Sequence, residues 1–340
     1  MKDTKANSIS TDTRSIAGSG IDPKQLQKLA PTILEDYSEF VAEKNNWSSD
    51  KAQKVINQGW NAFGKNGWYG PEFRDFCEFN QEVFQYKYDD SPEQVYDFYK
   101  FHERTDFFRM LSALRYSNSN DASVYNKLAE IILSQTKDKP EITIVDYGYG
   151  LATNTIFLTH LIKLNVNKRF KLVLVDVERP LAEEFILWMG KRYNIRIQFI
   201  KVTKENPHPK LPKFNFIQVK DSFEHIYHPE VIVDNINESM EKGGIAYVTY
   251  DDERKELSHV TCDLQIVRDK FKELNFVEVG KGLDQRGVML AKRDDVSKMV
   301  SISDDILTHR MSYVPSDELT NVDKNKIRQT FVSAAPQLEK

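Results

Sequence analysis

Apolar residues recur at helical spacing in the first part of the chain. Residues 31–43 and 49–63 repeat apolar positions with the period of an α-helix, which predicts two helices. Ser91, followed by proline and by glutamine three residues later, has the pattern of a capped helix start. Asp121 is in a position to cap a further helix that continues to residue 133. We therefore expect residues 23–135 to be helical.

The pattern changes at Glu141, where short apolar runs begin to alternate with helical stretches. Such alternation predicts a mostly parallel sheet with helices on both faces, because parallel neighbours need a crossover connection. The last strands are expected to form an antiparallel ending. The predicted strands are 143–147, 170–175, 196–201, 214–219, 245–249, 276–279 and 287–291.

These patterns divide the chain into four parts. Residues 1–20 are small and polar, which predicts a disordered N-terminus. Residues 21–138 are expected to form a helical cap or substrate region, and residues 139–294 an α/β domain. Residues 295–340 return to polar composition and are predicted to be a C-terminal tail.

Composition narrows the class of protein. The net charge of −4 argues against a general nucleic-acid binder. Two cysteines are too few for a disulfide framework or a zinc ribbon, which favours a reducing compartment. The sequence has neither an apolar signal segment at its start nor a run of about 20 apolar residues, so we expect no membrane insertion. The predicted location is the cytoplasm, and the sequence leaves the oligomeric state open.

The most informative motif follows the first predicted strand, where Asp146 precedes Gly148 and Gly150. Glycines allow a sharp turn and a close approach of the backbone to a ligand. The helix predicted from Thr153 would direct its first amides at that ligand. A dinucleotide site would need a third glycine and an acid about 20 residues later, so a nicotinamide-dependent dehydrogenase is disfavoured. An acid inside the loop suits a ligand that carries a positive charge.

At this point the chain resembles the class I S-adenosylmethionine-dependent methyltransferases, and in particular the quinone-biosynthesis type, over about residues 140–292. The resemblance implies a Rossmann-like, seven-stranded, mostly parallel sheet. Four segments match the family pattern in order: the acid-glycine loop, a second strand ending in an acid, the fourth strand with its Glu-His pair, and the glycine turn into strand five. These are residues 145–150, 172–176, 214–229 and 240–248.

The resemblance implies S-adenosylmethionine as the cofactor and assigns its contacts. Asp146 and the backbone of Gly148 and Gly150 would meet the amino acid end of the cofactor. Asp176 would accept hydrogen bonds from both ribose hydroxyls, and Asp221, after the fourth strand, is assigned to the same site. Without the resemblance, these acids would be turn residues and strand-end caps.

The sequence departs from the family pattern at three points. Ala152 replaces a third glycine that many members carry, and the spacing from Asp146 to Asp176 is longer than usual in the family. Residues 203–205 offer no clear counterpart of the acid often found after strand three, so no residue is assigned to the adenine contact. Glu178 is the alternative ribose ligand if the second strand ends two residues later than predicted.

The acceptor side of the site is expected near residues 221–228. His225 is the leading candidate for a catalytic base, because histidine titrates near neutral pH, and Glu224 stands beside it. The alternative is that the Glu-His pair only anchors the following helix. Asp221, Glu224 and His225, completed by His259, could instead form a metal site, as some RNA 2′-O-methyltransferases in this family do. The prediction kept here is a site without metal.

The leading hypothesis is methyl transfer to a small or medium-sized molecule, with an oxygen acceptor slightly favoured. One alternative is a metal-assisted RNA 2′-O-methyltransferase. Another is a non-catalytic protein that keeps the fold to bind a cofactor or a partner. Because fold resemblance does not determine the reaction, the identity of the acceptor stays open.

Overall fold

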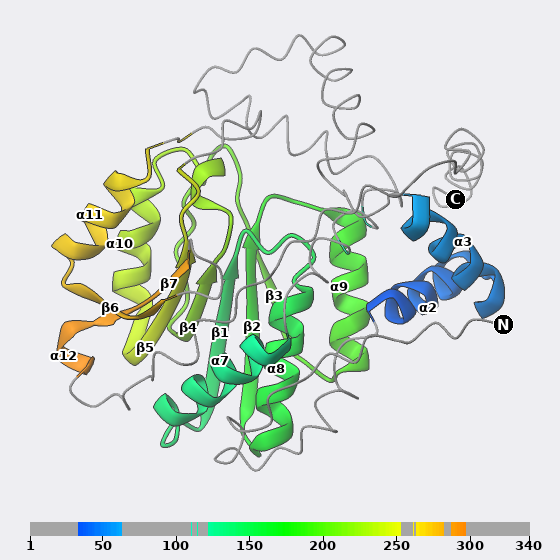
Figure 1. Ribbon diagram of the computed structural model, residues 1–340, viewed down its shortest axis with the longest axis horizontal. Helices are drawn as coiled ribbons and strands as arrows, with labels where there is room; N and C mark the ends of the chain where they lie inside the picture. Colours follow the sequence, from blue (N-terminus) through cyan, green and yellow to red (C-terminus); the bar gives the residue numbers. More distant parts are fainter. Residues whose placement is uncertain are drawn as a thin grey trace, which may run out of the picture.

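The computed structural model describes residues 33–62, 110, 114, 122–252, 261, 263–281 and 287–296 (Figure 1). The helix predicted from Ser91, the two terminal segments 1–20 and 297–340, and His259 lie outside these residues. The helices are α2 Ile33–Asn45, α3 Ser49–Ala62, α7 Ala122–Gln135, α8 Thr153–Asn165, α9 Pro180–Arg192, α10 Glu230–Ser239, α11 Gln265–Glu273 and α12 Arg293–Val296, with the short 3-10 helix η3 Phe223–His225.

Seven strands form one sheet in the order β3-β2-β1-β4-β5-β7-β6. Five strands run parallel, and β7 lies antiparallel between β5 and β6, which confirms the expected antiparallel ending. The strands are β1 Glu141–Tyr147, β2 Arg169–Asp176, β3 Ile197–Lys201, β4 Phe214–Val219, β5 Met240–Thr249, β6 Phe276–Lys281 and β7 Gly287–Lys292.

Each central strand is apolar on both sides because helices cover both faces of the sheet. Ile144 and Leu174 belong to a core cluster with α7, α8 and α9. The neighbouring residues Val145 and Val175 belong to the other cluster, with α10 and α11. The period of two along a strand thus divides one continuous apolar run between two cores.

The structure confirms the predicted strands within a few residues, except at the start of β5. That strand was expected from Ile245 and begins at Met240. Met240 pairs with Phe214, and the register then shifts so that Ile245 pairs with Phe216. The glycine segment predicted as a turn is therefore an irregularity within the strand, and Gly243 takes a φ of 74° there.

The N-terminal helices α2 and α3 confirm the two predicted from apolar spacing. Helix α3 packs against α2, and α2 packs beside α9 (Figure 1). Phe40 of α2 lies 5.2 Å from Phe185 of α9, measured between ring centroids. Arg192 Nε lies 2.9 Å from the buried Asp36 carboxylate, and Trp188 donates a 2.8 Å hydrogen bond to Glu43. These contacts attach α2 to the helix whose first turn follows β2.

Helix α7 packs against α8, with the rings of Tyr125 and Phe157 6.4 Å apart. It shares the core of the sheet, although it falls within the region predicted as a cap. None of the helices in the described ranges is long and apolar enough to cross a membrane.

Candidate functional site

The candidate site lies at the carboxyl ends of β1, β2 and β4. Strand β1 pairs with β2 on one side and with β4 on the other, so the order of the strands reverses around it. Ligands of open α/β sheets bind at such a switch point, where the loops after the two halves diverge. The segments after Tyr147, Asp176 and Val219 meet there.

The loop between β1 and α8 is built from left-handed residues. Gly148, Gly150 and Ala152 have φ values of 75°, 52° and 51°. Left-handed backbone is uncommon for residues with a side chain, so glycine is favoured at the first two positions. The alanine at position 152 adopts the same conformation immediately before α8 begins. This alternation turns the chain from the sheet into the helix within six residues.

Gly148 and Gly150 have different roles in this turn. A Cβ on Gly148 would lie 2.1 Å from Ser222 Oγ and 2.8 Å from Ser222 Cβ. Ser222 itself donates hydrogen bonds to the carbonyls of Tyr147 and Lys220, at 3.2 and 2.7 Å. Gly148 therefore lets the β1 and β4 loops close against each other. A Cβ on Gly150 would meet no atom within 4 Å, so the space beside Gly150 is open.

Asp176, at the end of β2, faces this loop. Its Oδ2 accepts a 3.3 Å hydrogen bond from the Gly150 amide, and its Oδ1 accepts a 2.8 Å bond from the Val177 amide. The strand ends at Asp176, as predicted, whereas the Glu178 side chain is 74% exposed. Asp176 is thus the strand-end acid, and Glu178 points to solvent.

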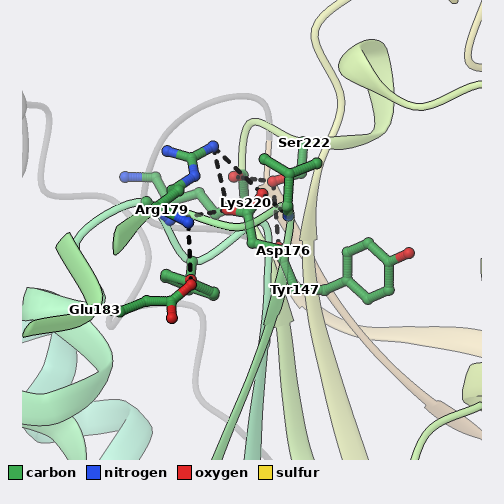
Figure 2. Close-up of polar contacts among 9 residues, drawn as sticks. Tyr147, Asp176, Arg179, Glu183, Lys220 and Ser222 are labelled. Atoms are coloured by element: carbon green, nitrogen blue, oxygen red, sulfur yellow. Dashed lines mark hydrogen bonds and ion pairs between the residues drawn. The ribbon is translucent and has the colours of Figure 1, made fainter. Parts of the chain in front are cut away.

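Arg179 also binds Asp176. Its Nη2 lies 3.3 Å from Oδ1 and 3.2 Å from Oδ2, so one guanidinium nitrogen reaches both carboxylate oxygens. Figure 2 shows Arg179 extending over Asp176, with Glu183 on the α9 side and Ser222 on the β4 side. The Arg179 and Asp176 side chains are only 15% and 10% exposed, so solvent screens this ion pair weakly.

Glu183, in the first turn of α9, supports the same loop. It accepts hydrogen bonds from the Arg179 amide at 3.0 Å, from the Tyr149 hydroxyl at 3.2 Å and from Lys201 at the end of β3. Burial by itself would raise the pKa of Glu183, but the Arg179 amide, Lys201 and Tyr149 outweigh it and lower that pKa. Glu183 is therefore a fixed negative charge that ties the glycine loop to α9 and β3.

Asp146 lies beneath the loop and is 3% exposed. Thr155 of α8 donates a hydrogen bond to its Oδ2, and Gln218 of β4 approaches its Oδ1 at 3.5 Å. Burial, followed by the nearby charge of Asp176, raises the pKa of Asp146 to about 7, against the opposing effect of the Thr155 hydrogen bond. Asp146 thus holds α8 and β4 together under the turn, and a cationic ligand above it would favour its charged form.

The β4 loop carries the predicted acceptor-side residues. Asp221 has a φ of 47°, and its amide and carboxylate both contact Thr249 Oγ1, at 2.6 and 3.2 Å. Glu224 is buried, and the Thr261 amide donates to its carbonyl at 3.1 Å. The side chain of His225 is 22% exposed, and its Nε2 lies 3.9 Å from Glu224 Oε1. Within the described parts of the chain, no three His, Cys, Asp or Glu side chains gather as a metal site.

The structure thus places the predicted cofactor residues around one turn, and it adds residues that the sequence analysis missed. Thr155 and Gln218 contact Asp146, and Arg179 and Glu183 surround Asp176. A signal existed for Arg179, since it follows the strand-end acid by three residues at the start of a helix. Gln218 gave none, because a buried polar residue inside an apolar strand is recognised only from its partners.

The chain is similar to a family of known proteins and to several solved structures. Residues 121–277 match the model of a family described as a methyltransferase domain. No curated protein matches the chain significantly. A solved structure from Listeria monocytogenes, assigned to the class I S-adenosylmethionine-dependent methyltransferases, is 11% identical with a TM-score of 0.40 and covers 94% of this chain and 100% of its own.

Two further solved structures are similar over about half of the chain. The precorrin-6y C5,15-methyltransferase of Geobacter metallireducens is 15% identical with a TM-score of 0.33, and the alignment covers 49% of this chain and 88% of that one. The cyclase SpnF is 12% identical with a TM-score of 0.34, and the alignment covers 45% of this chain and 57% of that one. These TM-scores are too low to carry an argument about the substrate. The family match spans the glycine loop, the acid of β2 and the β4 loop, and it identifies residues 121–277 as similar to a methyltransferase domain.

Proposed function

We propose that this protein transfers the methyl group of S-adenosylmethionine to a small or medium-sized acceptor, with an oxygen acceptor favoured. The observation that carries the proposal is the pairing of Asp176 with the Gly150 amide at the open side of the loop. An acid at that point can accept hydrogen bonds from a ribose diol, while the backbone leaves room for the rest of the cofactor.

The proposed cofactor residues are Asp146, Gly148, Gly150, Asp176 and Asp221. Asp146 is buried below the loop. We propose that its negative charge attracts the cofactor ammonium, directly or through a bridging water, and that its hydrogen bonds hold the loop in shape. Asp221 is held by Thr249 and would shape the β4 side of the site.

Methyl transfer is an in-line displacement in which the sulfonium charge disperses as the methyl group moves to the acceptor. The protein must first align the two reactants, and a base is needed only for an acceptor that carries a proton. We propose His225 as that base, with Glu224 as the residue that orients it at 3.9 Å. The proposed acceptor is a small molecule in a cytoplasmic protein, with no metal and no nucleic acid involved.

The first test is calorimetric titration of the protein with S-adenosylmethionine and S-adenosylhomocysteine. We expect micromolar binding by the wild type and a loss of about 100-fold in Asp176→Asn, because the substitution removes the negative charge and one of the two oxygens that would accept from the diol. Asp146→Ala should also weaken binding. Glu178→Gln is the matched control: it removes an acid two residues away that is 74% exposed, and binding should stay within about twofold.

A folded wild-type protein that binds neither ligand would refute the proposal and favour a non-catalytic role. Once binding is established, transfer of a labelled methyl group to panels of oxygen, nitrogen and carbon acceptors tests the reaction. Labelling of RNA that is abolished by a chelator would instead favour the metal-assisted RNA alternative.

A further inference from the structure

The further inference concerns how the cofactor gains access to Asp176, and it rests on the proposed function. A carboxylate has two oxygens with about four acceptor positions in total. Four contacts already occupy those of Asp176. The Val177 amide and Arg179 bind Oδ1, and the Gly150 amide and Arg179 bind Oδ2.

The two backbone contacts are part of the fold. The Gly150 amide belongs to the turn between β1 and α8, and the Val177 amide directly follows β2. Both would remain when a ligand binds. The two contacts of Arg179 come from a side chain, and there is one on each oxygen. A ribose diol also needs one acceptor position on each oxygen.

We propose that Arg179 occupies the positions of the two ribose hydroxyls, so that an adenosyl ligand binds only after the guanidinium has left Asp176. Arg179 is therefore an affinity-determining residue that opposes cofactor binding. It holds the site closed with an intramolecular ion pair whose two side chains are 15% and 10% exposed.

The surroundings of Arg179 offer the displaced guanidinium a second position. Glu183 lies one helical turn further along α9, and it already accepts a hydrogen bond from the Arg179 amide. Its lowered pKa keeps it charged, mainly because the Arg179 amide and Lys201 outweigh its burial. The displaced guanidinium can therefore move towards Glu183.

The alternative role for Arg179 is a direct contact with the cofactor. The two roles predict opposite effects of the same substitution, because removing a competitor strengthens binding and removing a ligand contact weakens it. Arg179→Met separates them, since methionine keeps an unbranched stem and loses both the charge and the donors.

The experiment is a titration of wild type, Arg179→Met and Arg196→Met with adenosine, 2′-deoxyadenosine and S-adenosylhomocysteine. Arg196 is exposed and lies immediately before the first residue of β3, at the end of that strand away from the site. Its substitution therefore controls for the loss of one positive charge. We expect Arg179→Met to bind adenosine and S-adenosylhomocysteine about tenfold more tightly. Arg196→Met should match the wild type. Adenosine has no positive charge, so a gain there is not an electrostatic attraction to the uncovered carboxylate.

The gain should be smaller for 2′-deoxyadenosine, which has one hydroxyl less to place on Asp176. Weaker binding of all three ligands by folded Arg179→Met, with wild-type binding intact, would overturn this inference and leave the proposed function standing. Equal affinities in both proteins would also overturn it. Absence of S-adenosylhomocysteine binding in every folded variant would refute the proposed function itself.

Discussion

The two sides of the crevice are built differently. On the β1–β2 side, residues 146–150 and 176–183, polar groups converge on open space: backbone amides, Asp176 and Arg179 meet beside Gly150. On the β4 side, residues 221–228, the chain is anchored inward. Phe223 is fully buried and stacks on Tyr250 at 6.2 Å, Ser222 binds the Tyr147 carbonyl, and Glu224 is 1% exposed.

We propose that the two sides bind different reactants. The β1–β2 side is defined by strand ends and a turn, which suits a cofactor that is the same in every turnover. The β4 side presents His225 from a short 3-10 helix held by its neighbours. We propose that specificity for the acceptor depends on the β4 side, so the two sides can be tested separately.

The largest expected effect is at the contact between the two sides. Gly148→Ala should destabilise the protein by about 3 kcal/mol, because it combines a Cβ at a φ of 75° with an overlap on Ser222. Gly150→Ala is the matched control at a φ of 52° with open space around it, and it should cost about 1 kcal/mol. Denaturant unfolding measures both.

The double variant Gly148→Ala with Ser222→Gly sharpens this prediction. Glycine at 222 removes the two atoms that lie 2.1 and 2.8 Å from the new Cβ, so part of the lost stability should return. Additive losses would contradict the packing of the two loops described above.

The next effect concerns the β4 side alone. If His225 is the base, His225→Asn should lower kcat about 100-fold towards an acceptor that must lose a proton, and leave S-adenosylhomocysteine binding unchanged. His228→Asn is the control, because that histidine is 59% exposed and pairs with Glu230. Loss of stability with full kcat would make the Glu-His pair an anchor.

The third prediction concerns Asp146, whose pKa burial raises from 3.8 to about 7. A carboxyl with a raised folded-state pKa contributes stability below pH 4, which is lost as the pH rises through about 7. Asp146→Asn stays neutral, so its stability relative to the wild type should improve by roughly 2 kcal/mol between pH 4 and pH 5.5. Unfolding free energies measured across that range should diverge, and parallel curves would exclude titration of Asp146 there.

The same comparison explains what the sequence could predict. The strands, the acid-glycine turn and Asp176 were predictable, because each depends on local pattern: apolar runs, glycines at left-handed positions and an acid at a strand end. The different roles of Gly148 and Gly150 were not predictable. The overlap at Gly148 depends on Ser222, which lies more than 70 residues away in the sequence. The early start of β5 was missed because its pairing with Phe214 is non-local. The assigned site residues themselves stay predictions.

The smallest expected effect tests whether the network beside the β1–β2 side positions the loop. The Tyr149 hydroxyl donates to Glu183 at 3.2 Å, and its ring packs 5.8 Å from Phe199. Tyr149→Phe keeps the ring and loses one hydrogen bond, so binding of S-adenosylhomocysteine should weaken about threefold. Tyr193→Phe loses a similar bond, to Asp36, but between α9 and α2. It should lower stability by about 1 kcal/mol without changing affinity. If both variants kept wild-type affinity, Glu183 would hold α9 to β3 without positioning the glycine loop, and the cofactor side would depend on its backbone alone.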